Sequence, residues 1–386
     1  MPSAPSDPPP SGAPEGELYL DWNATTPPHP EVLAAMADAA RTAWGNPASV
    51  HRSGRRASAI VEDARQAIAE LVERDPRDVI LTGGGTEANN LALAGARALV
   101  TSRLEHPSVT RVAEALESRG VPVSWLPVPE NGRIEPEAVG RALHALGSGA
   151  QVAIAAVNHE TGVIQPVEAV AEIVRSAQGA LHVDAVQAVG RLPLDALRGA
   201  DSLSLAAHKL RGPKGIGALV ARPGKLPSPV LLGGSQERGI RPGTADAGAA
   251  AGFCVAARLA GAGSERYARI APLREAIERA LAELVLVNGA GAPRAPHVTN
   301  FSMPGVRGDE LAAALDLEGV RVSSGSACTA GTSEPSKVIE AMLGRERARS
   351  ALRVSLGELT TPADIERFLL VFRAVLPRLA QLSSSA

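Results

Sequence analysis

The chain has 386 residues, of which 45% are hydrophobic and 21% are charged, proportions that are ordinary for a globular protein. Its 39 basic residues nearly balance its 41 acidic ones and only 2% of residues are aromatic, which argues against nucleic acid and anionic membranes as partners. Two cysteines, no apolar run of membrane-spanning length and no secretory signal pattern predict a cytoplasmic protein without a disulfide framework.

The N-terminal third begins with a segment that cannot form a core. Residues 1–17 are rich in Pro, Ser and Gly and predict a disordered tail, so order is expected to begin at Leu18. Apolar residues at helical spacing then predict helices over residues 30–44 and 58–74. The loop between them, GNPASVH at 45–51, consists mostly of turn-forming residues.

Short apolar runs and amphipathic helices alternate through the middle of the chain. Strands are predicted at residues 79–81, 99–102, 123–126, 152–157, 181–183, 203–206 and 218–221. Helical spacing occurs over residues 87–98, 107–119, 136–146 and 167–177. This alternation favours an α/β domain with a mostly parallel seven-stranded sheet.

The pattern changes near residue 261 and predicts a second, smaller α+β domain. A long helical pattern to residue 284 precedes further elements, namely strands at 298–303, 320–323 and 351–355 and helices at 308–318 and 362–382. We therefore expect a large domain over residues 18–260, with its first residues packing on the small domain, and a small domain over residues 261–386.

The segment SLSLAAHKLRGPKGIG at residues 202–217 carries the first candidate for chemistry. Its apolar run ends on His208 and Lys209 and is followed by a turn rich in glycine and proline. The C-terminal end of a parallel strand is where open α/β sheets bind ligands, and a half-buried amine there can form an imine with a carbonyl group. A lone lysine beside a turn is far more often an ordinary surface residue. Lys209 becomes a candidate only if other strand ends supply complementary groups.

Three other predicted strand ends do so. The glycine run in LTGGGTEANN at 81–90 opens a helix and can bind an anion, although a plain tight turn is about as typical of it. Asp184 is either a helix cap or the partner of a pyridinium nitrogen. His106 is either a surface cap or a ring that stacks on a flat cofactor and transfers protons. With Lys209, these groups jointly indicate pyridoxal 5'-phosphate (PLP), and no metal site is expected.

The two cysteines lie in different contexts. Cys254 belongs to the apolar helical run AAAGFCVAA and is expected to be inert core. Cys328 lies in the Gly- and Ser-rich segment SSGSACTAGTSEP at 323–335, which is typical of an exposed and reactive thiol. An incidental exposed thiol is the alternative.

The motifs as a set resemble the cysteine desulfurases, a class V aminotransferase-like branch of the fold-type-I PLP-dependent transferases. The resemblance extends from residue 19 to about residue 370. It rests on seven motifs, which are GNPASVH at 45–51, GGTEANN at 84–90, EH at 105–106, HVDAVQAVG at 182–190, AHKLRGPKGIGAL at 207–219, QERGIRPGT at 236–244 and SSGSACT at 323–329. It implies an enzyme that converts L-cysteine to L-alanine.

The resemblance also assigns roles to residues around the cofactor. Lys209 carries the covalent link to PLP, Asp184 faces the pyridine nitrogen, Gln187 bonds the phenolic oxygen, and His106 stacks on the ring. The phosphate positions are Gly85, Thr86, His208 and, from the other subunit of a homodimer, Thr244.

The substrate positions are implied in the same way. Arg353 matches the arginine that binds the substrate carboxylate, a bidentate contact suited to guanidinium, and Asn23 is expected beside it. Cys328 matches the cysteine that receives the sulfur as a persulfide, so that Cys328, Lys209 and His106 form the catalytic set. An acceptor protein of unknown identity would then take the sulfur for iron–sulfur cluster or thio-cofactor synthesis.

Two positions depart from the family pattern. His159 stands where the family usually has an asparagine next to the phenolic oxygen, and Ala206 stands where it usually has a serine that bonds the phosphate.

Two alternatives to a desulfurase stay open. A selenocysteine lyase or another class V PLP enzyme would share everything except the need for Cys328. A non-catalytic sulfur-assembly scaffold would have no use for Lys209 and Arg353 together.

Overall fold

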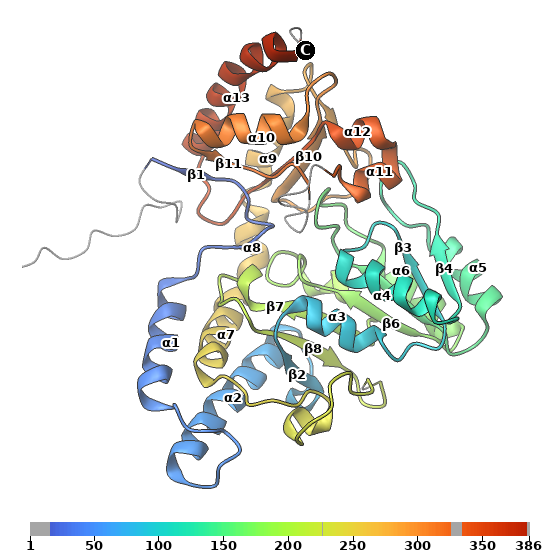
Figure 1. Ribbon diagram of the computed structural model, residues 1–386, viewed down its shortest axis with the longest axis vertical. Coiled ribbons are helices and arrows are strands. Elements are labelled where there is room, and N and C mark those ends of the chain that lie inside the picture. Colours follow the sequence, from blue (N-terminus) through green and yellow to red (C-terminus); the bar gives the residue numbers. More distant parts are fainter. Residues whose placement is uncertain (1–15, 226, 326–333, 384–386) are drawn as a thin grey trace, which may run out of the picture. The chain divides into compact units, whose positions relative to one another are not determined.

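The computed structural model describes residues 16–225, 227–325 and 334–383, which form two compact units (Figure 1). The larger unit comprises Pro28–Asn158 and Val163–Glu265. The smaller unit comprises the chain up to Pro27, the short segment His159–Gly162 and the chain from Arg266 onward. Residues 1–15 of the predicted tail, and Cys328, lie outside the described residues.

A seven-stranded sheet forms the centre of the larger unit. Its strand order is β2-β8-β7-β6-β5-β3-β4. The bounds are Val79–Thr82 for β2, Leu99–Ser102 for β3, Val123–Leu126 for β4, Gln151–Ala155 for β5, Ala180–Asp184 for β6, Ser202–Ala206 for β7 and Gly217–Ala221 for β8. β8 runs antiparallel to both of its neighbours and the other pairs are parallel. The predicted mostly parallel α/β fold is confirmed.

Most strands of this sheet are short apolar runs because both faces of the sheet are covered. Every residue of β2, β3, β7 and β8 is buried. The helices that follow the strands are α3 (Gly85–Leu93), α4 (Pro107–Ser118), α5 (Pro136–Leu146) and α6 (Val167–Ser176), and they flank the sheet in Figure 1. α4 and α5 both begin with proline, which suits a first helical turn.

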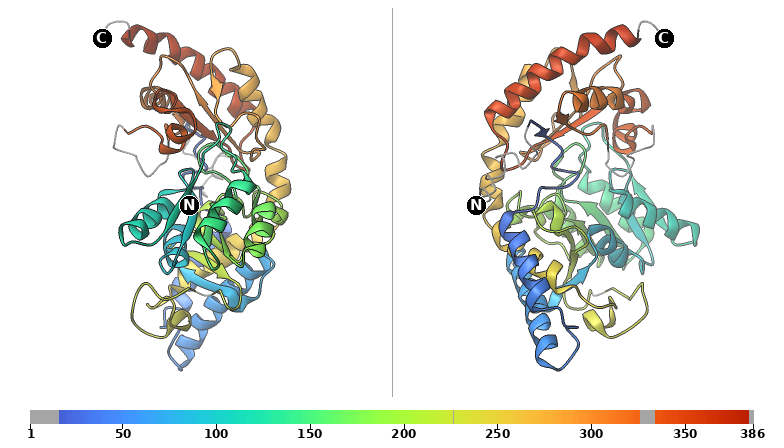
Figure 2. Two further views of the ribbon diagram at one scale, coloured as in Figure 1. Left: turned by 90° about the vertical axis from the view of Figure 1, so that its right-hand side faces the viewer. Right: turned by 60° about the vertical axis from the view of Figure 1, so that its left-hand side comes forward.

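Three further helices pack together in the larger unit. α1 (Pro30–Thr42) and α2 (Arg52–Leu71) both contact α7 (Ala247–Ala260), as Figure 2 shows. α7 is rich in alanine and most of its residues are buried. Cys254 lies in α7 with 6% exposure, and burial raises the pKa of its thiol. This placement agrees with the inert core cysteine expected from the sequence.

The smaller unit is built on a three-stranded antiparallel sheet of order β12-β10-β9 (Ala351–Ser355, Val298–Ser302 and Leu286–Val287). A separate parallel pair joins β1 (Leu18–Tyr19) to β11 (Val320–Arg321), so the first described residues belong to this unit. The helices are α8 (Gly263–Ala268), which begins in the larger unit, α9 (Ala271–Ala280), α10 (Gly308–Leu317), α11 (Lys337–Leu343), α12 (Arg345–Arg349) and α13 (Pro362–Ser383).

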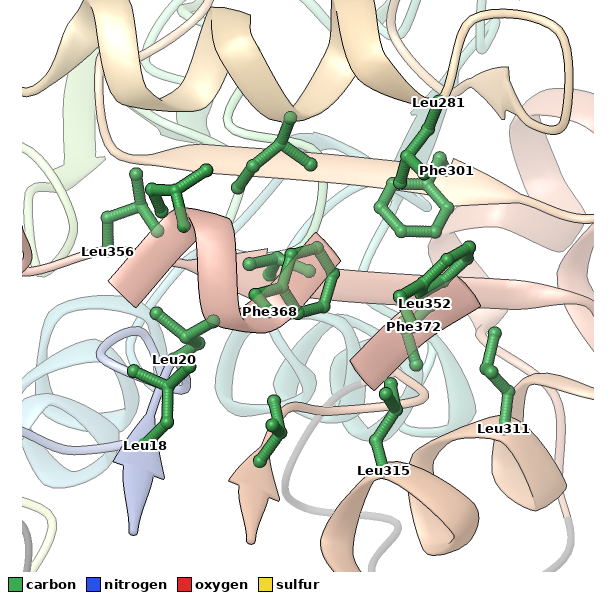
Figure 3. Close-up of a cluster of buried hydrophobic side chains, with 14 of the residues drawn as sticks. Leu18, Leu20, Leu281, Phe301, Leu311, Leu315, Leu352, Leu356, Phe368 and Phe372 are labelled. Atoms are coloured by element: carbon green, nitrogen blue, oxygen red, sulfur yellow. The ribbon is translucent and has the colours of Figure 1, made fainter. Parts of the chain in front are cut away.

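A cluster of leucine and phenylalanine side chains forms the core of the smaller unit (Figure 3). Phe372 of α13 lies 5.9 Å from Phe301 of β10 in an edge-on arrangement and 5.7 Å from Phe368, measured between ring centroids. Leu18 and Leu20 belong to the same cluster. The first described residues are therefore tied into this core as well as into the β1–β11 pair.

One predicted helix of this region was wrong. The sequence predicts a single helical stretch from residue 261 to 284, but two helices, α8 and α9, occupy it. Pro272 lies in the first turn of α9. Proline is compatible with a first turn but removes a hydrogen bond from a helix interior, so the helix begins anew there. Among the described helices, none is long and apolar enough to cross a bilayer.

Candidate active site

The predicted site residues of the larger unit follow strands that end at the same edge of the sheet. β6 ends at Asp184, and Asp184 is the register partner of Ser204 in the parallel strand β7. Lys209 ends a single 3₁₀ turn, Ala207–Lys209, that directly follows β7. His106 follows β3, which is parallel to β5 and through it to β6. The fold therefore brings Lys209, Asp184 and His106 to one edge.

The turn that carries Lys209 is closed by its own backbone. The N–H groups of Leu210 and Gly212 both donate to the carbonyl oxygen of Ala207 at 2.9 Å. A Cβ atom on Gly212 would lie only 2.7 Å from that oxygen, so the close approach requires glycine. His208 and Lys209 are both half-buried. Burial, with the positive charge of Lys209 as the next cause, lowers the pKa of His208 to about 4, so its imidazole is neutral at neutral pH.

A buried arginine, which sequence reasoning missed, joins two of the predicted residues. Arg191 is 1% exposed, donates from Nη1 to the side-chain oxygen of Gln187, and donates from Nη2 to the carbonyl oxygen of Lys209 at 3.0 Å. A buried guanidinium requires such partners, because desolvation of an unpaired charge is costly. The only sequence signal was its spacing of four residues from Gln187, on the same side of a helical turn.

The glycine run of the predicted anion site forms the start of α3. Gly84 has φ +150°, and a Cβ atom on Gly85 would lie 2.7 Å from Cγ2 of Val186. The N-cap of α3 is Gly84, which has no side chain to cap the helix, and Thr86 beside it is exposed. Free N–H groups at a helix N-terminus, approached closely because glycine has no side chain, fit a phosphate group. This local structure fits the phosphate of PLP.

Asp184 and His106 have local structural roles that leave the proposed ones open. Asp184 is buried, and its Oδ1 accepts from the backbone N–H of Val186 at 3.1 Å. His106 is the N-cap of α4, where Nδ1 accepts from the backbone N–H of Ser108 at 3.1 Å. His106 thus has the helix-cap role that the sequence offered as an alternative, whereas Asp184 caps no helix, because a turn follows β6. Each of these two contacts uses one atom of the side chain, and a carboxylate oxygen can accept more than one hydrogen bond.

Glu105 belongs to the EH motif of the sequence analysis, which gave it no role. It is 3% exposed and precedes His106 in the chain. Burial, reinforced by the nearby Asp184 carboxylate, raises the pKa of Glu105 well above its usual value. The Glu-His pair in the sequence did not indicate that Glu105 is buried.

The other predicted residues with described side chains lie in the smaller unit or in a loop. Arg353 in β12 is 2% exposed, and its Nη2 donates to Oδ1 of Asp21 at 2.7 Å. Nη1 of Arg353 and Nδ2 of Asn23 both donate to the carbonyl oxygen of His159, at 3.0 and 3.1 Å. The smaller unit therefore brings Arg353, Asn23 and His159 together. Thr244 lies exposed in the loop before α7.

Comparison with known proteins places the chain in a family. The profile of the aminotransferase class-V family matches residues 18–368. An IscS-like cysteine desulfurase of Mycobacterium tuberculosis is 40% identical over 93% of this chain and 96% of its own. The solved structure of a NifS-like protein matches with a TM-score of 0.85 at 31% identity, over 94% of this chain and 100% of that one.

A further solved structure contains a ligand. SspA in complex with cysteine matches with a TM-score of 0.76 at 30% identity, over 88% of this chain and 98% of that one. The profile covers more than half of the chain, and the relatives cover nearly all of it. The chain belongs to the aminotransferase class-V family, in its cysteine desulfurase branch.

Proposed function

We propose that this cysteine desulfurase works at the sheet edge that carries Lys209, Asp184 and the start of α3, with PLP bound there. The observation that supports it is the joint presence, at one edge of one sheet, of a half-buried amine, a buried carboxylate and a helix N-terminus whose N-cap is glycine. When bound, PLP supplies the electron sink that makes the Cα proton of an amino acid acidic.

The proposed roles around PLP follow from the chemistry of each side chain. Lys209 supplies the amine for the covalent link, Asp184 keeps the ring nitrogen protonated, and His106 stacks on the ring. Gln187, which accepts a hydrogen bond from Arg191, bonds the phenolic oxygen. The phosphate-binding groups are Gly85, Thr86, His208 and the Thr244 of a second copy of the chain.

Arg353 is proposed to bind the carboxylate of L-cysteine. Its ion pair with Asp21 holds the guanidinium in a fixed plane, and its Nε atom has no partner among the described residues. A planar group with donors on a second edge suits a bidentate carboxylate contact. Asn23, bonded to the same carbonyl oxygen as Arg353, holds that region in place.

Cys328 is proposed to receive the sulfur. Its thiolate attacks the sulfur of bound cysteine, the Cβ–S bond breaks, and an S–S bond forms. The carbon fragment takes up a proton and leaves as alanine, so one cysteine and one thiol yield one alanine and one persulfide. Attack requires thiolate, because the thiol is a poor nucleophile. An acceptor protein then removes the sulfur for iron–sulfur cluster or thio-cofactor synthesis.

The direct test is to incubate the purified protein with PLP and L-cysteine and to measure alanine and persulfide in single-turnover and steady-state conditions. Alanine and enzyme-bound persulfide in equal amounts are expected in the first turnover. Alanine without persulfide would indicate a lyase, and no alanine from a PLP-loaded protein would contradict the proposal.

We expect a homodimer whose interface includes the loop before α7. Val230, Leu231 and Leu232 in this loop are 50%, 57% and 89% exposed, an apolar run that a partner would cover. Leu232→Asp should raise the dimer dissociation constant at least roughly tenfold, since it puts a charge where the partner would cover a leucine. Sedimentation velocity at several concentrations measures this.

Leu317→Asp provides the control for this substitution. Leu317 ends α10 and is 88% exposed, so both variants remove an equally exposed leucine. The Leu317 variant should remain dimeric. Because Thr244 is proposed to reach the partner's phosphate site, the Leu232 variant should also lose PLP faster on dilution. A monomeric wild type that retains PLP would contradict both expectations.

Ala206→Ser is expected to slow the loss of PLP. The Cβ of Ala206 lies 3.6 Å from the position of a Cβ on Gly85, so a hydroxyl group added there lies near the start of α3. A hydrogen bond to a charged group contributes about 1.5–3 kcal/mol, which corresponds to roughly 10- to 100-fold slower release. Absorbance after rapid dilution measures the rate. An unchanged rate would mean that another donor already serves the phosphate.

A further inference from the structure

A branched chain of buried polar side chains connects the middle of the sheet to His106. Oγ of Ser202 lies 2.9 Å from Nδ1 of His182, whose Nε2 lies 2.9 Å from Oδ1 of Asn89. The amide nitrogen of Asn89 then donates to Oδ2 of Asp184 and to Oγ of Ser108, both at 2.8 Å. All five residues are buried, and Asn89 is 1% exposed.

The directions of these hydrogen bonds follow from the chemistry of Asp184. A carboxylate oxygen only accepts, so Asn89 must turn its NH₂ group toward Asp184 and its carbonyl oxygen toward His182. His182 therefore carries a proton on Nε2. Burial lowers the pKa of His182 to about 4, so the ring is neutral and its Nδ1 accepts from the hydroxyl of Ser202. Each hydrogen in this branch has one assigned position.

The second branch leads from Asn89 through Ser108 to His106. The backbone N–H of Ser108 donates to Nδ1 of His106, so that nitrogen carries a lone pair. Oγ of Ser108 lies 2.7 Å from the same Nδ1 and must supply the hydrogen between them. Burial, reinforced by Lys209 and opposed by Asp184, lowers the pKa of His106. A neutral His106 thus carries its proton on Nε2.

We propose that Asn89 is a positioning residue for this site, because its one amide group fixes the orientation of the Asp184 carboxylate and, through Ser108, of His106. This inference rests on the proposed function, in which Asp184 and His106 contact the cofactor. It also specifies the chemistry of His106. At Nε2 the neutral ring then offers a hydrogen-bond donor and no acceptor.

The test uses nitrogen NMR of protein labelled with ¹⁵N at its 8 histidines, first without PLP and then with it. His106→Gln and His182→Gln variants assign the two sets of signals. In the wild type both rings should show a protonated Nε2 and an unprotonated Nδ1. In Asn89→Ala, His182 should exchange between its two tautomers. With PLP bound, the absorption maximum of PLP in Asn89→Ala should shift from its wild-type position. The kcat of this variant should fall by a larger factor than its KM changes.

Asn288→Ala is the matched control. Asn288 lies in the smaller unit with 0% exposure, and its Nδ2 donates to Oδ1 of Asn300 and Oγ of Ser302 while its Oδ1 accepts from Nε of Arg347. Like Asn89, it thus donates two side-chain hydrogen bonds and accepts one. The control should lose comparable thermal stability but keep the wild-type histidine signals and PLP spectrum.

Several results would overturn the proposal. A wild-type His106 protonated on Nδ1 would contradict the assigned directions. Wild-type histidine signals and PLP spectrum in Asn89→Ala would reduce Asn89 to a packing role. If Asn89→Ala does not fold, Ser108→Ala should shift the Nδ1 signal of His106 alone, and Ser108→Thr should restore it; no shift would refute the link. The spectra recorded without PLP test the assigned hydrogen-bond directions even if the proposed function fails.

Discussion

Lys209→Ala is expected to give a protein that is not yellow after reconstitution with PLP and that produces no detectable alanine from L-cysteine. The half-buried amine directly after β7 is the group proposed to hold PLP covalently, and alanine has no nucleophile to replace it. Borohydride reduction followed by mass spectrometry of peptides measures the link. The wild type should carry PLP on the peptide that contains Lys209.

Lys214→Ala is the control for this prediction. Lys214 lies five positions later in the same Gly- and Pro-rich turn but is exposed, so its replacement should leave both colour and turnover unchanged. Reduction that fixes PLP to Lys214 in the wild type, or to any residue of the Lys209→Ala protein, would show that the amine has been misassigned. Folding of both variants is checked by their thermal unfolding without PLP.

Much of the larger unit was predictable because its strands are continuous apolar runs that end at polar residues or turns. β3, β4 and α5 have the predicted bounds, and β7 and β8 differ by one residue at one end. The strand ends in turn predicted which segments meet at one edge. Lys209, Asp184 and His106 were found in this way, since parallel strands present their C-terminal ends together.

The residues that support this edge were not predictable, because their contacts join distant positions of the chain. Asn89 and His182 are 93 residues apart and meet only because α3 packs against the sheet. The hydrogen bond from Arg191 to the carbonyl oxygen of Lys209 depends on the path of the loop after β6. Pattern and propensity describe local structure, whereas the pKa of Glu105 and the directions of these hydrogen bonds depend on burial in the folded chain.

The division of the chain also depends on tertiary contacts. The sequence predicts a change of domain at residue 260, where the helical pattern shifts, while the compact units divide after Glu265. His159–Gly162 belongs to the smaller unit although strands of the larger unit precede and follow it. Its carbonyl bonds with Arg353 and Asn23 explain this, and no local pattern in the segment reveals them.

Cys328→Ser is expected to separate PLP binding from sulfur transfer. Lys209 and Asp184, the groups proposed to hold PLP, are unaffected by this substitution, so the variant should be yellow and its absorbance should still respond to L-cysteine. Alanine and persulfide should fall to the background level, because a hydroxyl group cannot take sulfur from the substrate. Parallel assays of absorbance, alanine and persulfide on one preparation measure the separation.

Cys254→Ser tests whether the loss is specific to one thiol. Cys254 is buried in α7, where Sγ lies 3.5 Å from the carbonyl oxygen of Asp63, and the thiol's raised pKa disfavours thiolate. A buried hydroxyl should cost at most about 1–3 kcal/mol of stability and leave persulfide formation unchanged. If Cys328→Ser instead made alanine at the wild-type rate, sulfur would leave without a protein thiol. The protein would then act as a lyase, because Cys254, the remaining cysteine, has neither the exposure nor the ionisation that sulfur transfer requires.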